Sequence, residues 1–229
     1  MSDFIGESLA CLRGERPVFA GLDFSVASGG ALLLTGANGS GKSSLLRVMA
    51  GLLPPTAGQI WWDREDLARE PDAHHARTAY LGHLDAVKAA LTPREDLMFW
   101  LRYRAPHLNA YSGRIRADEA LAWAGLTPLA DLPCRVLSAG QRRRLAIARI
   151  AFDETADLWL LDEPTTALDA NGALLLHDRV ALHRARGGMI VAATHQPLHW
   201  PDAQTLDLDV LARRRSDAAT RGKYFDNVA

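Results

Sequence analysis

Eight residues near the start of the chain have the types and spacing of a phosphate-binding loop. Residues 36–43 read G-A-N-G-S-G-K-S, after the apolar run 31–34 and before the apolar-rich segment 45–49. This order predicts a strand, a glycine-rich turn and a helix. Such a turn directs backbone N–H groups, the positive end of the helix dipole and the Lys42 ammonium to one point. The chemistry predicted there is binding of a nucleoside triphosphate.

A second group of residues, 158–164, reads L-W-L-L-D-E-P. The apolar run predicts a strand buried on both faces that ends at Asp162 and Glu163. Nucleotide sites of open α/β sheets lie at the carboxyl ends of the strands, so we expect both acids beside the phosphate-binding loop. From there Asp162 can reach Mg²⁺ and Glu163 can face the terminal phosphate.

A third group, residues 137–141, reads L-S-A-G-Q and comes before R-R-R-L-A-I-A-R, which predicts an amphipathic helix. Ser138 at the start of this helix is compatible with two roles. It can be an ordinary N-cap, or the helix start can bind an anion. The run of arginines alone is typical of a solvated helix face.

The composition sets the surroundings of these motifs. The chain has 229 residues, a net charge of −1 and 23% charged residues, so it is large enough for one sizeable core and shows no bulk attraction to nucleic acid. Its two cysteines, Cys11 and Cys134, lack metal-ligand spacing. No apolar run is long enough to span a bilayer, and no export leader is recognised. We therefore expect a cytoplasmic protein whose partners supply any membrane span.

Strands and helices are predicted to alternate. Strands are expected at 21–26, 31–35, 59–62, 77–81, 158–161 and 189–193, with helices after most of them. This alternation favours an α/β fold with a mainly parallel sheet covered on both faces. The stretch from about 84 to 135 breaks the pattern, because it has helical periods near 96–104 and 117–124 and no strand. We interpret it as a helical insert.

Together the motifs resemble the ATP-binding subunit of ABC transporters over nearly the whole chain. The phosphate-binding loop, Ser138, the two acids, Asp169 in A-L-D and His195 in T-H-Q follow one another in the order and spacing of that family. The resemblance implies a P-loop NTPase fold of the ABC ATPase type, with an antiparallel N-terminal β part beside the parallel sheet. It also implies one domain over residues 1–229, with a helical subdomain inserted at about 84–140.

In this family two copies face each other head to tail, and the resemblance extends that arrangement to this chain. ATP held by residues 39–44 of one copy is expected to meet Ser138 and Gly140 of the other, while Asp169 contacts the opposite subunit. A composite site explains why one chain has two phosphate-binding helix starts and one pair of acids. The implied nucleotide-binding residues are Gly36, Ala37, Asn38, Gly39, Ser40, Gly41, Lys42, Ser43, Ser44 and Arg13, and the implied signature residues that contact the partner's ATP are Ser138, Ala139, Gly140 and Gln141.

Phosphoryl transfer depends mostly on positioning and charge neutralisation, which assigns the expected roles. Lys42 is expected to bind the β- and γ-phosphates, and Ser43 with Asp162 to hold Mg²⁺. Glu163 is expected to act as the base or to orient the attacking water. His195 follows a predicted strand and is expected to sense or polarise the γ-phosphate.

Three positions depart from the family pattern. His83 in Y-L-G-H stands where most members have a glutamine near Mg²⁺ and the water, and we place it with the catalytic residues as a hydrogen-bond donor or acceptor. Arg13 stands near the usual adenine-stacking aromatic, where it can stack on the base or be a solvated arginine. Ala139 replaces the commoner glycine, which costs about 1 kcal/mol of strain only if its φ is positive.

These departures sharpen the resemblance. Residues 82–83, 91–97, 137–144, 169–172 and 194–198 are similar to the ATPase subunit of the haem exporter of bacterial cytochrome c maturation. That similarity implies a homodimer of ATPase subunits, peripheral at the cytoplasmic face of the inner membrane and bound to integral membrane subunits that handle haem. It also implies that ATP hydrolysis drives release of a haem-loaded chaperone.

Other functions are compatible with parts of this pattern. The ATPase of an ABC transporter for another substrate stays open, because the motor residues say little about cargo. A soluble ABC ATPase of translation or DNA repair would need tandem cassettes or long coiled-coil arms. A non-hydrolysing regulatory module would be expected to lack Glu163 or His195. The pairs His74-His75 and His199-Trp200 lie in polar sequence surroundings. We expect them to be solvated, and we expect no direct haem ligand and no nucleic-acid contact in this chain.

Two further stretches leave their roles open. The apolar residues Leu97, Phe99, Trp100 and Leu101 can pack the insert's own core or form a groove for a partner's cytoplasmic helix. The tail after Leu198 is predicted to be a basic surface or disordered.

Overall fold

A parallel sheet positions the predicted motifs at one of its edges. In the computed structural model, which describes residues 3–14 and 16–210, this sheet has the order β6-β7-β8-β3-β9, with every neighbouring pair parallel. Because the strands are parallel, the segments that follow them meet at their carboxyl ends. The strands are β6 (Thr78–Leu81), β7 (Leu158–Asp162), β8 (Met189–Ala193), β3 (Ala31–Thr35) and β9 (Gln204–Asp207).

The central strands of this sheet are buried on both faces, as their continuous apolar sequences predict. In β7, Leu158 and Leu160 point into one core, while Trp159 and Leu161 point into another. All five residues of β7 are buried. The strand that carries the two acids is therefore held rigidly between two packed layers.

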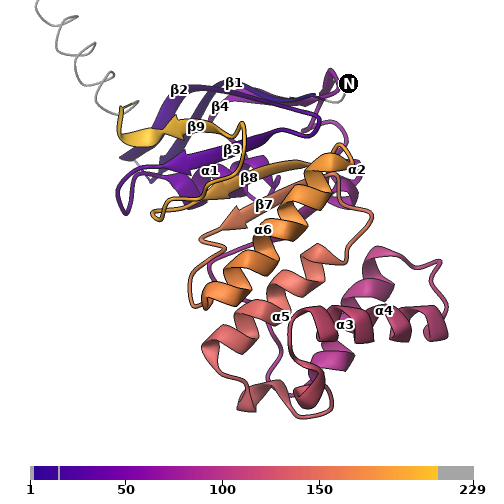
Figure 1. Cartoon of the computed structure of the whole chain (residues 1–229). Helices are drawn as coiled ribbons and strands as arrows, with labels where there is room; N and C mark the ends of the chain where they lie inside the picture. The colour runs from indigo at the N-terminus through magenta and orange to yellow at the C-terminus, as the bar shows by residue number, and fades with distance from the viewer. Residues whose placement is uncertain (1–2, 15, 211–229) are drawn as a thin grey trace, which may run out of the picture.

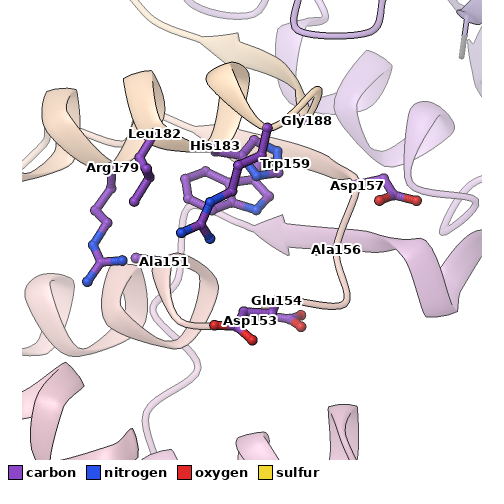
Figure 2. A pocket seen from close by; sticks show the side chains of 11 residues that line it. Ala151, Asp153, Glu154, Ala156, Asp157, Trp159, Arg179, Leu182, His183 and Gly188 are labelled. Carbon is purple, nitrogen blue, oxygen red and sulfur yellow. The ribbon is translucent and has the colours of Figure 1, made fainter. Parts of the chain in front are cut away.

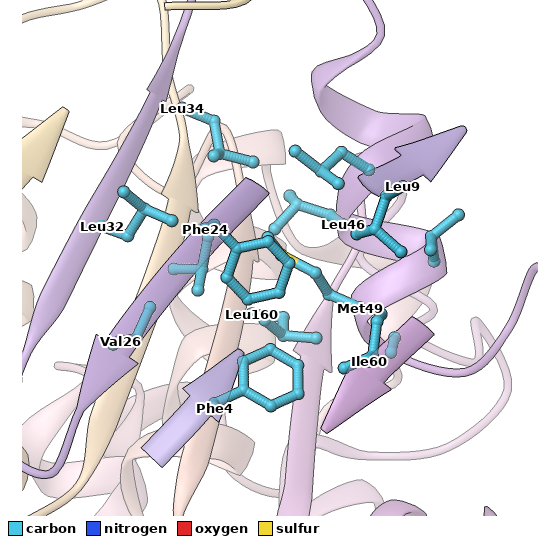
Figure 3. Packing of buried hydrophobic residues seen from close by; sticks show 14 of the residues in the cluster. Phe4, Leu9, Phe24, Val26, Leu32, Leu34, Leu46, Met49, Ile60 and Leu160 are labelled. Atoms are coloured by element: carbon cyan, nitrogen blue, oxygen red, sulfur yellow. The ribbon is translucent and has the colours of Figure 1, made fainter. Parts of the chain in front are cut away.

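One face of the parallel sheet is covered by α1 (Lys42–Met49), which lies between it and an antiparallel sheet (Figure 1). Figure 3 shows Leu46 and Met49 of this helix among Phe4, Phe24 and Leu160, so a single core joins both sheets. The antiparallel sheet has the order β2-β1-β4-β5, and α2 (Pro71–Arg77) follows it. Its strands are β1 (Asp3–Arg13), β2 (Arg16–Ala27), β4 (Ala57–Trp62) and β5 (Glu65–Asp66).

The other face of the parallel sheet is covered by α5 (Ala139–Ala151) and α6 (Ala170–Ala185). Behind α5 a third core joins it to α3 (Pro93–Arg104) and α4 (Ala110–Trp123). These two helices lie at the end of the molecule away from the antiparallel sheet (Figure 1). Short 3₁₀ turns, Thr127–Leu129 and Cys134–Val136, lead from α4 to α5.

The predicted α/β class, with a mainly parallel sheet, an antiparallel N-terminal part and helices between strands, is confirmed. Each predicted strand is present, although the one expected at 21–26 is part of the longer β2, and Arg77 ends α2 rather than beginning β6. The helical periods near 96–104 and 117–124 overlap α3 and α4. No helix in the described ranges is both long and apolar enough to cross a membrane.

The prediction for the tail is wrong where the structure describes it. Gln204–Asp207 forms β9, which pairs along β3 from Leu32 to Thr35. The strand escaped prediction because it is an edge strand with mostly exposed side chains, so it lacks an apolar run. The basic residues after 210 lie outside the described residues.

Candidate functional site

The phosphate-binding loop has the backbone that its glycines predict. Gly36, Gly39 and Gly41 have φ values of 133°, 84° and 105°, a region that favours glycine. A Cβ on Gly41 would lie 2.6 Å from Cγ1 of Val18 in β2, whereas a Cβ on Gly39 would meet nothing within 4 Å. Gly41 is therefore packed against the protein, and Gly39 faces open space where a ligand can approach the backbone.

Lys42 at the first position of α1 is buried, and its ammonium is already engaged by the loop. Nζ donates hydrogen bonds to the carbonyls of Gly36 at 2.7 Å and Ala37 at 3.0 Å. The N–H of Ala37 donates to Oδ2 of Asp209 at 2.7 Å. The peptide between Gly36 and Ala37 thus lies between a cation at its oxygen and a carboxylate at its N–H.

Asp209 lies outside every motif predicted from the sequence. It lies two residues after β9, and pairing of β9 with β3 brings it to the start of the loop. Contacts between residues 37 and 209 cannot be read from local spacing, so the sequence carried no signal for it.

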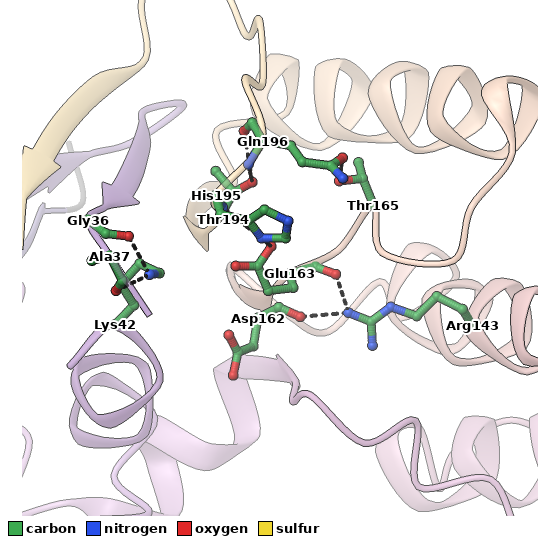
Figure 4. Close-up of polar contacts among 10 residues, drawn as sticks. All are labelled: Gly36, Ala37, Lys42, Arg143, Asp162, Glu163, Thr165, Thr194, His195 and Gln196. Carbon is green, nitrogen blue, oxygen red and sulfur yellow. Dashed lines mark hydrogen bonds and ion pairs between the residues drawn. The ribbon is translucent and has the colours of Figure 1, made fainter. Parts of the chain in front are cut away.

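The two acids lie at the end of β7, as predicted. Asp162 is only 2% exposed, and its Oδ2 has no hydrogen-bond partner among the described residues. Its carboxylate points to the side of α1, where Lys42 lies (Figure 4). A buried carboxylate oxygen without a partner is costly unless a cation or donor completes it. This oxygen therefore fits a divalent cation held beside the loop.

Glu163 continues the chain in an unusual backbone conformation. Its φ is 48°, in the left-handed region that non-glycine residues rarely adopt. Its N–H donates to the carbonyl of Ala193 at the end of β8, at 2.9 Å. The left-handed turn redirects the side chain away from the path of β7.

His195 meets Glu163 directly. Its Nδ1 lies 2.7 Å from Oε2 of Glu163, and its N–H lies 3.4 Å from the same oxygen. The preceding residue, Thr194, is anchored by a 3.1 Å hydrogen bond from its N–H to the carbonyl of Leu34 in β3. The ends of β3, β7 and β8 thus bring the loop, the acid and the histidine to one place (Figure 4).

Arg143 links α5 to the end of β7. Its Nη2 donates to the carbonyls of Asp162 at 2.6 Å and Glu163 at 2.7 Å. Its Nη1 donates to the carbonyl of Gly82 at 3.1 Å and to Oδ1 of Asp85 at 3.0 Å. Arg143 is 3% exposed, so the interpretation of the arginine run as a solvated face is wrong at this position. The run of arginines showed that this helix carries positive charge, but nothing in the sequence indicated which arginine is buried.

Ser138 and Gln141 form a reciprocal cap at the start of α5. Ser138 Oγ accepts from the N–H of Gln141 at 3.2 Å, and Gln141 Oε1 accepts from the N–H of Ser138 at 2.8 Å. Ala139 is helical, so it carries no left-handed strain. A Cβ on Gly140 would lie 2.7 Å from the carbonyl oxygen of Ala167. Gly140 is therefore the residue that lets the segment before α6 approach α5.

Asp169 is the N-cap of α6, where its Oδ1 accepts from the N–H of Gly172 at 2.8 Å. This residue is exposed, as is Ser138 at the start of α5. Among the contacts that the structure describes, neither residue touches the phosphate-binding loop of its own chain.

The structure does not bring all predicted residues together. His83 is exposed and has no described contact with Asp162 or Glu163. Its neighbour Gly82 is connected to the two acids through Arg143, which donates hydrogen bonds to the carbonyls of all three residues. Arg13 is exposed at the end of β1, on the hairpin whose strand β2 packs against Gly41. Its stacking role stays a prediction.

A groove of about 730 Å³ lies between β6 of the parallel sheet and α3. His83, Tyr80 and Trp100 line it, with Arg149 on the wall formed by α5. Leu97 and Leu101 are instead buried in the core of the insert. Core packing is therefore confirmed for Leu97 and Leu101, while a partner helix in the groove beside Trp100 stays a prediction.

A smaller cavity of about 170 Å³ opens at the opposite edge of the sheet (Figure 2). Asp157 and Gly188, the residues just before β7 and β8, line it together with Trp159 and His183. It contains none of the predicted site residues, because they lie at the carboxyl ends of the strands.

The prediction that His74 is solvated is wrong. The residue is 5% exposed. Its Nε2 lies 2.9 Å from the carbonyl oxygen of Met49, and its ring stacks on Phe4 with centroids 6.0 Å apart. Burial lowers its pKa to about 4. Trp200 is also buried, whereas His75 and His199 are exposed.

Comparison with known proteins identifies the family. A family model described as "ABC transporter" matches residues 19–166. The chain belongs to the ABC transporter family.

Within the ABC transporter family, the chain is similar in sequence to proteins named cytochrome c biogenesis ATP-binding export protein CcmA. It is 54% identical to the CcmA protein of Paramagnetospirillum magneticum, over 92% of this chain and 96% of that protein. It is 51% identical to the CcmA protein of Rhodospirillum rubrum, over 94% of this chain and 90% of that protein.

Solved ABC structures share the fold. An ATP-binding cassette, MJ0796, solved as a dimer in a post-hydrolysis state bound to ADP and Pi, superposes with a TM-score of 0.75 at 24% identity, over 84% of this chain and 88% of that one. A putative ABC transporter ATP-binding protein from Pyrococcus furiosus gives a TM-score of 0.77 at 18% identity, over 91% and 98%. The predicted ABC ATPase fold is confirmed.

Proposed function

We propose that this chain is the ATP-hydrolysing subunit of a membrane ABC complex of cytochrome c maturation, in which hydrolysis drives release of a haem-loaded chaperone. The observation that carries the ATPase activity is the convergence of Lys42, Asp162, Glu163 and His195 at the carboxyl ends of β3, β7 and β8. The names and 51–54% identities of the CcmA relatives support the assignment to haem export over another cargo.

Residues 36–44 hold the phosphates of ATP, with Lys42 on the β- and γ-phosphates and Arg13 on the adenine. Mg²⁺ neutralises charge on the phosphate oxygens when it is bound. Ser43 in the first turn of α1 and the unpartnered Oδ2 of Asp162 would hold this ion. Both donors are oxygens, the ligands that Mg²⁺ prefers.

Glu163 orients the attacking water and accepts its proton as the oxygen bonds to the γ-phosphorus. The bond from that phosphorus to the β–γ bridging oxygen breaks, so that ADP and phosphate leave. His195 is held against Glu163 and donates a hydrogen bond toward the γ-phosphate. His83 at the mouth of the groove completes the catalytic set in place of the family's usual glutamine.

The complete site needs a second copy of the chain. Ser138, Ala139, Gly140 and Gln141 of one copy cap the ATP held by the other, and Asp169 contacts the opposite subunit. The exposure of Ser138 and Asp169, and their lack of described contact with their own phosphate-binding loop, support this arrangement. We further propose that residues 1–229 are one ABC ATPase domain, with residues 84–140 as its helical subdomain.

A mixed-dimer experiment tests the composite site. Chains with Lys42→Ala and chains with Ser138→Arg each form homodimers in which both sites are defective. In a mixed dimer, the site that uses the Lys42→Ala loop also receives the Ser138→Arg helix start, so it has both defects. The other site combines the normal loop of one chain with the normal Ser138 of its partner and is intact. We expect about one trapped ATP per mixed dimer and almost none in either homodimer. Equal ATP occupancy in the Ser138→Arg homodimer and the wild type would refute the arrangement.

The groove is proposed to receive a cytoplasmic helix of an integral membrane subunit, which keeps this chain peripheral at the cytoplasmic face of the inner membrane. Exposed Leu52, Leu84 and Tyr103 line it and supply the apolar surface that a helix-in-groove contact uses. We propose that ATP rotates the helical insert as a unit. Cysteine crosslinks placed around Pro93 should then change with nucleotide, and unchanged crosslinks would contradict the rotation.

Purification of the tagged chain in detergent from its native membrane tests the cargo. We expect integral membrane subunits to copurify, with a haem absorbance spectrum that belongs to them. Copurification of a membrane complex that lacks haem under all nucleotide conditions would favour a transporter for another substrate.

A further inference from the structure

Arg143 has no role in the site proposed above, yet it is among the most thoroughly bonded side chains near it. The two nitrogens Nη1 and Nη2 reach the carbonyls of Asp162, Glu163 and Gly82 and the carboxylate of Asp85, at 2.6 to 3.1 Å. A buried guanidinium is costly unless its charge and donors are matched. Here Asp85 matches the charge, and three backbone carbonyls with the Asp85 carboxylate accept from Nη1 and Nη2. The buried Nε has no hydrogen-bond partner among the described residues.

The contacts to residues 162 and 163 act on a strained piece of backbone. Glu163 has a φ of 48°, a conformation that costs about 1 kcal/mol or more for a residue with a Cβ. Such strain persists only where the surroundings hold it. Figure 4 shows the guanidinium of Arg143 bonded to the carbonyls of Asp162 and Glu163, which belong to the two peptides on either side of the Glu163 Cα. Both peptide planes are thereby fixed in direction.

We infer that Arg143 is a positioning residue for Glu163, through which α5 holds the acid in its left-handed conformation. This inference deepens the proposed function and rests on it. Arg143 lies five residues after Ser138 on the same helix, so the helix start proposed to cap the partner's ATP is joined rigidly to the acid that serves this chain's own ATP.

A second arginine of α5 strengthens this connection. Arg149 Nε bonds to Oδ2 of Asp96 in α3 at 2.6 Å, and its Nη1 bonds to the carbonyl of Asp85 at 3.0 Å. Asp85 therefore accepts a hydrogen bond from Arg143 at its carboxylate and another from Arg149 at its backbone carbonyl. The first part of the loop after β6, from Gly82 to Ala86, is therefore bonded to α5 through both arginines.

The test compares Arg143→Gln with Arg144→Gln in the purified full-length chain, assembled with its membrane subunits. Arg144 is the adjacent arginine, and its described hydrogen bond goes to the carbonyl of Ala124, away from β7. We expect Arg143→Gln to lower kcat about 10- to 100-fold while the Kd for ATP changes by less than about threefold. Arg144→Gln should keep both values near those of the wild type.

A double-mutant cycle separates positioning from general structural damage. If Arg143 acts through Glu163, then adding Arg143→Gln to Glu163→Gln should lower kcat little further. Fully additive losses would overturn the inference, as would an unchanged kcat in Arg143→Gln or a Kd that rises as much as kcat falls. A wild-type complex without ATPase activity would instead refute the proposed function.

Asp85→Asn keeps the test decisive if Arg143→Gln fails to fold. This change removes the charge that faces Nη1 but leaves the Nη2 contacts to the carbonyls of Asp162 and Glu163. We expect a smaller loss of kcat, about two- to fivefold, with the Kd for ATP unchanged. An unchanged kcat in Asp85→Asn together with a folded, fully active Arg143→Lys would overturn the inference.

Discussion

The imidazole of His195 and the carboxylate of Glu163 are held in direct contact, with Nδ1 2.7 Å from Oε2. The two residues come from the ends of neighbouring strands, β8 and β7, whose register pairs Asp162 with Ala193. Because each side chain follows a buried strand, their separation is set by the sheet. The sheet therefore preorganises the pair, which limits the reorganisation needed during catalysis.

Replacing Glu163 tests its role as the water-orienting base. Glu163→Gln keeps the size of the side chain but removes its ability to accept a proton. We expect kcat to fall about 100-fold or more, while ATP binding persists and an ATP-bound dimer accumulates. Steady-state ATPase assays and size-exclusion chromatography measure both effects, with Glu154→Gln at the opposite edge of the sheet as the control. Ordinary turnover in Glu163→Gln would remove the assigned role.

His195→Ala removes the partner of that carboxylate. We expect kcat to fall by about 10- to 100-fold with little change in the Kd for ATP, because the loop and Lys42 stay intact. His199→Ala, at an exposed histidine four residues away, should behave like the wild type. Equal activities of the two variants would show that the contact with Glu163 has no catalytic role.

Lys42→Ala tests nucleotide binding itself. The change removes a buried ammonium that makes charge-assisted hydrogen bonds, which contribute about 1.5–3 kcal/mol each. We expect the Kd for ATP to rise by at least tenfold, measured by titration with a fluorescent ATP analogue. Lys88→Ala, at an exposed lysine outside the loop, should leave the Kd unchanged. A similar Kd in both variants would contradict the assigned site.

Asp209→Ala removes the acceptor that holds the N–H of Ala37. The lost hydrogen bond to a charged group is worth about 1.5–3 kcal/mol, so the Kd for ATP should rise by roughly 10- to 150-fold. The kcat at saturating ATP should change little. Asp178→Ala on the exposed face of α6 is the matched control. A Kd identical to that of the control would mean that the loop keeps its shape without Asp209.

His74 predicts how stability depends on pH. Burial lowers its pKa from the ordinary value of 6.5 to about 4, so between these values the unfolded chain binds a proton that the folded chain does not. The free energy of unfolding should therefore fall as the pH drops from about 6.5 to 4, by roughly 2–3 kcal/mol from this group. Urea unfolding at pH 7 and pH 5 measures it. His74→Gln should show a smaller drop than His75→Gln, and equal drops would contradict the prediction.

The parts of the site that could be predicted are those encoded in contiguous residues. The phosphate-binding loop and the acids after β7 are marked by short spacings and by apolar runs that only buried strands need. The parallel sheet then brings these segments to one edge without further information.

The parts that could not be predicted depend on long-range contacts. Asp209 reaches the loop only because β9 pairs with β3, and β9 has the polar pattern of an edge strand. Arg143 and Arg144 are neighbouring residues of the same type, so the sequence does not distinguish them. The orientation of α5 in the fold directs Arg143, and not Arg144, toward β7. His74 has polar neighbours in the sequence, which predicted a solvated side chain, but the orientation of α2 places its ring in the core beside Phe4.

The close approach of Gly140 to the carbonyl of Ala167 ties the start of α5 to the segment before α6. Both segments are proposed to face the second copy of the chain, so one subunit presents them as a single preformed surface rather than as two adjustable loops. A side chain at position 140 would separate them by pushing on the backbone of Ala167, itself left-handed with a φ of 65°. A substitution as small as Gly140→Ala should then weaken dimer closure from both segments at once, although it adds only one methyl group.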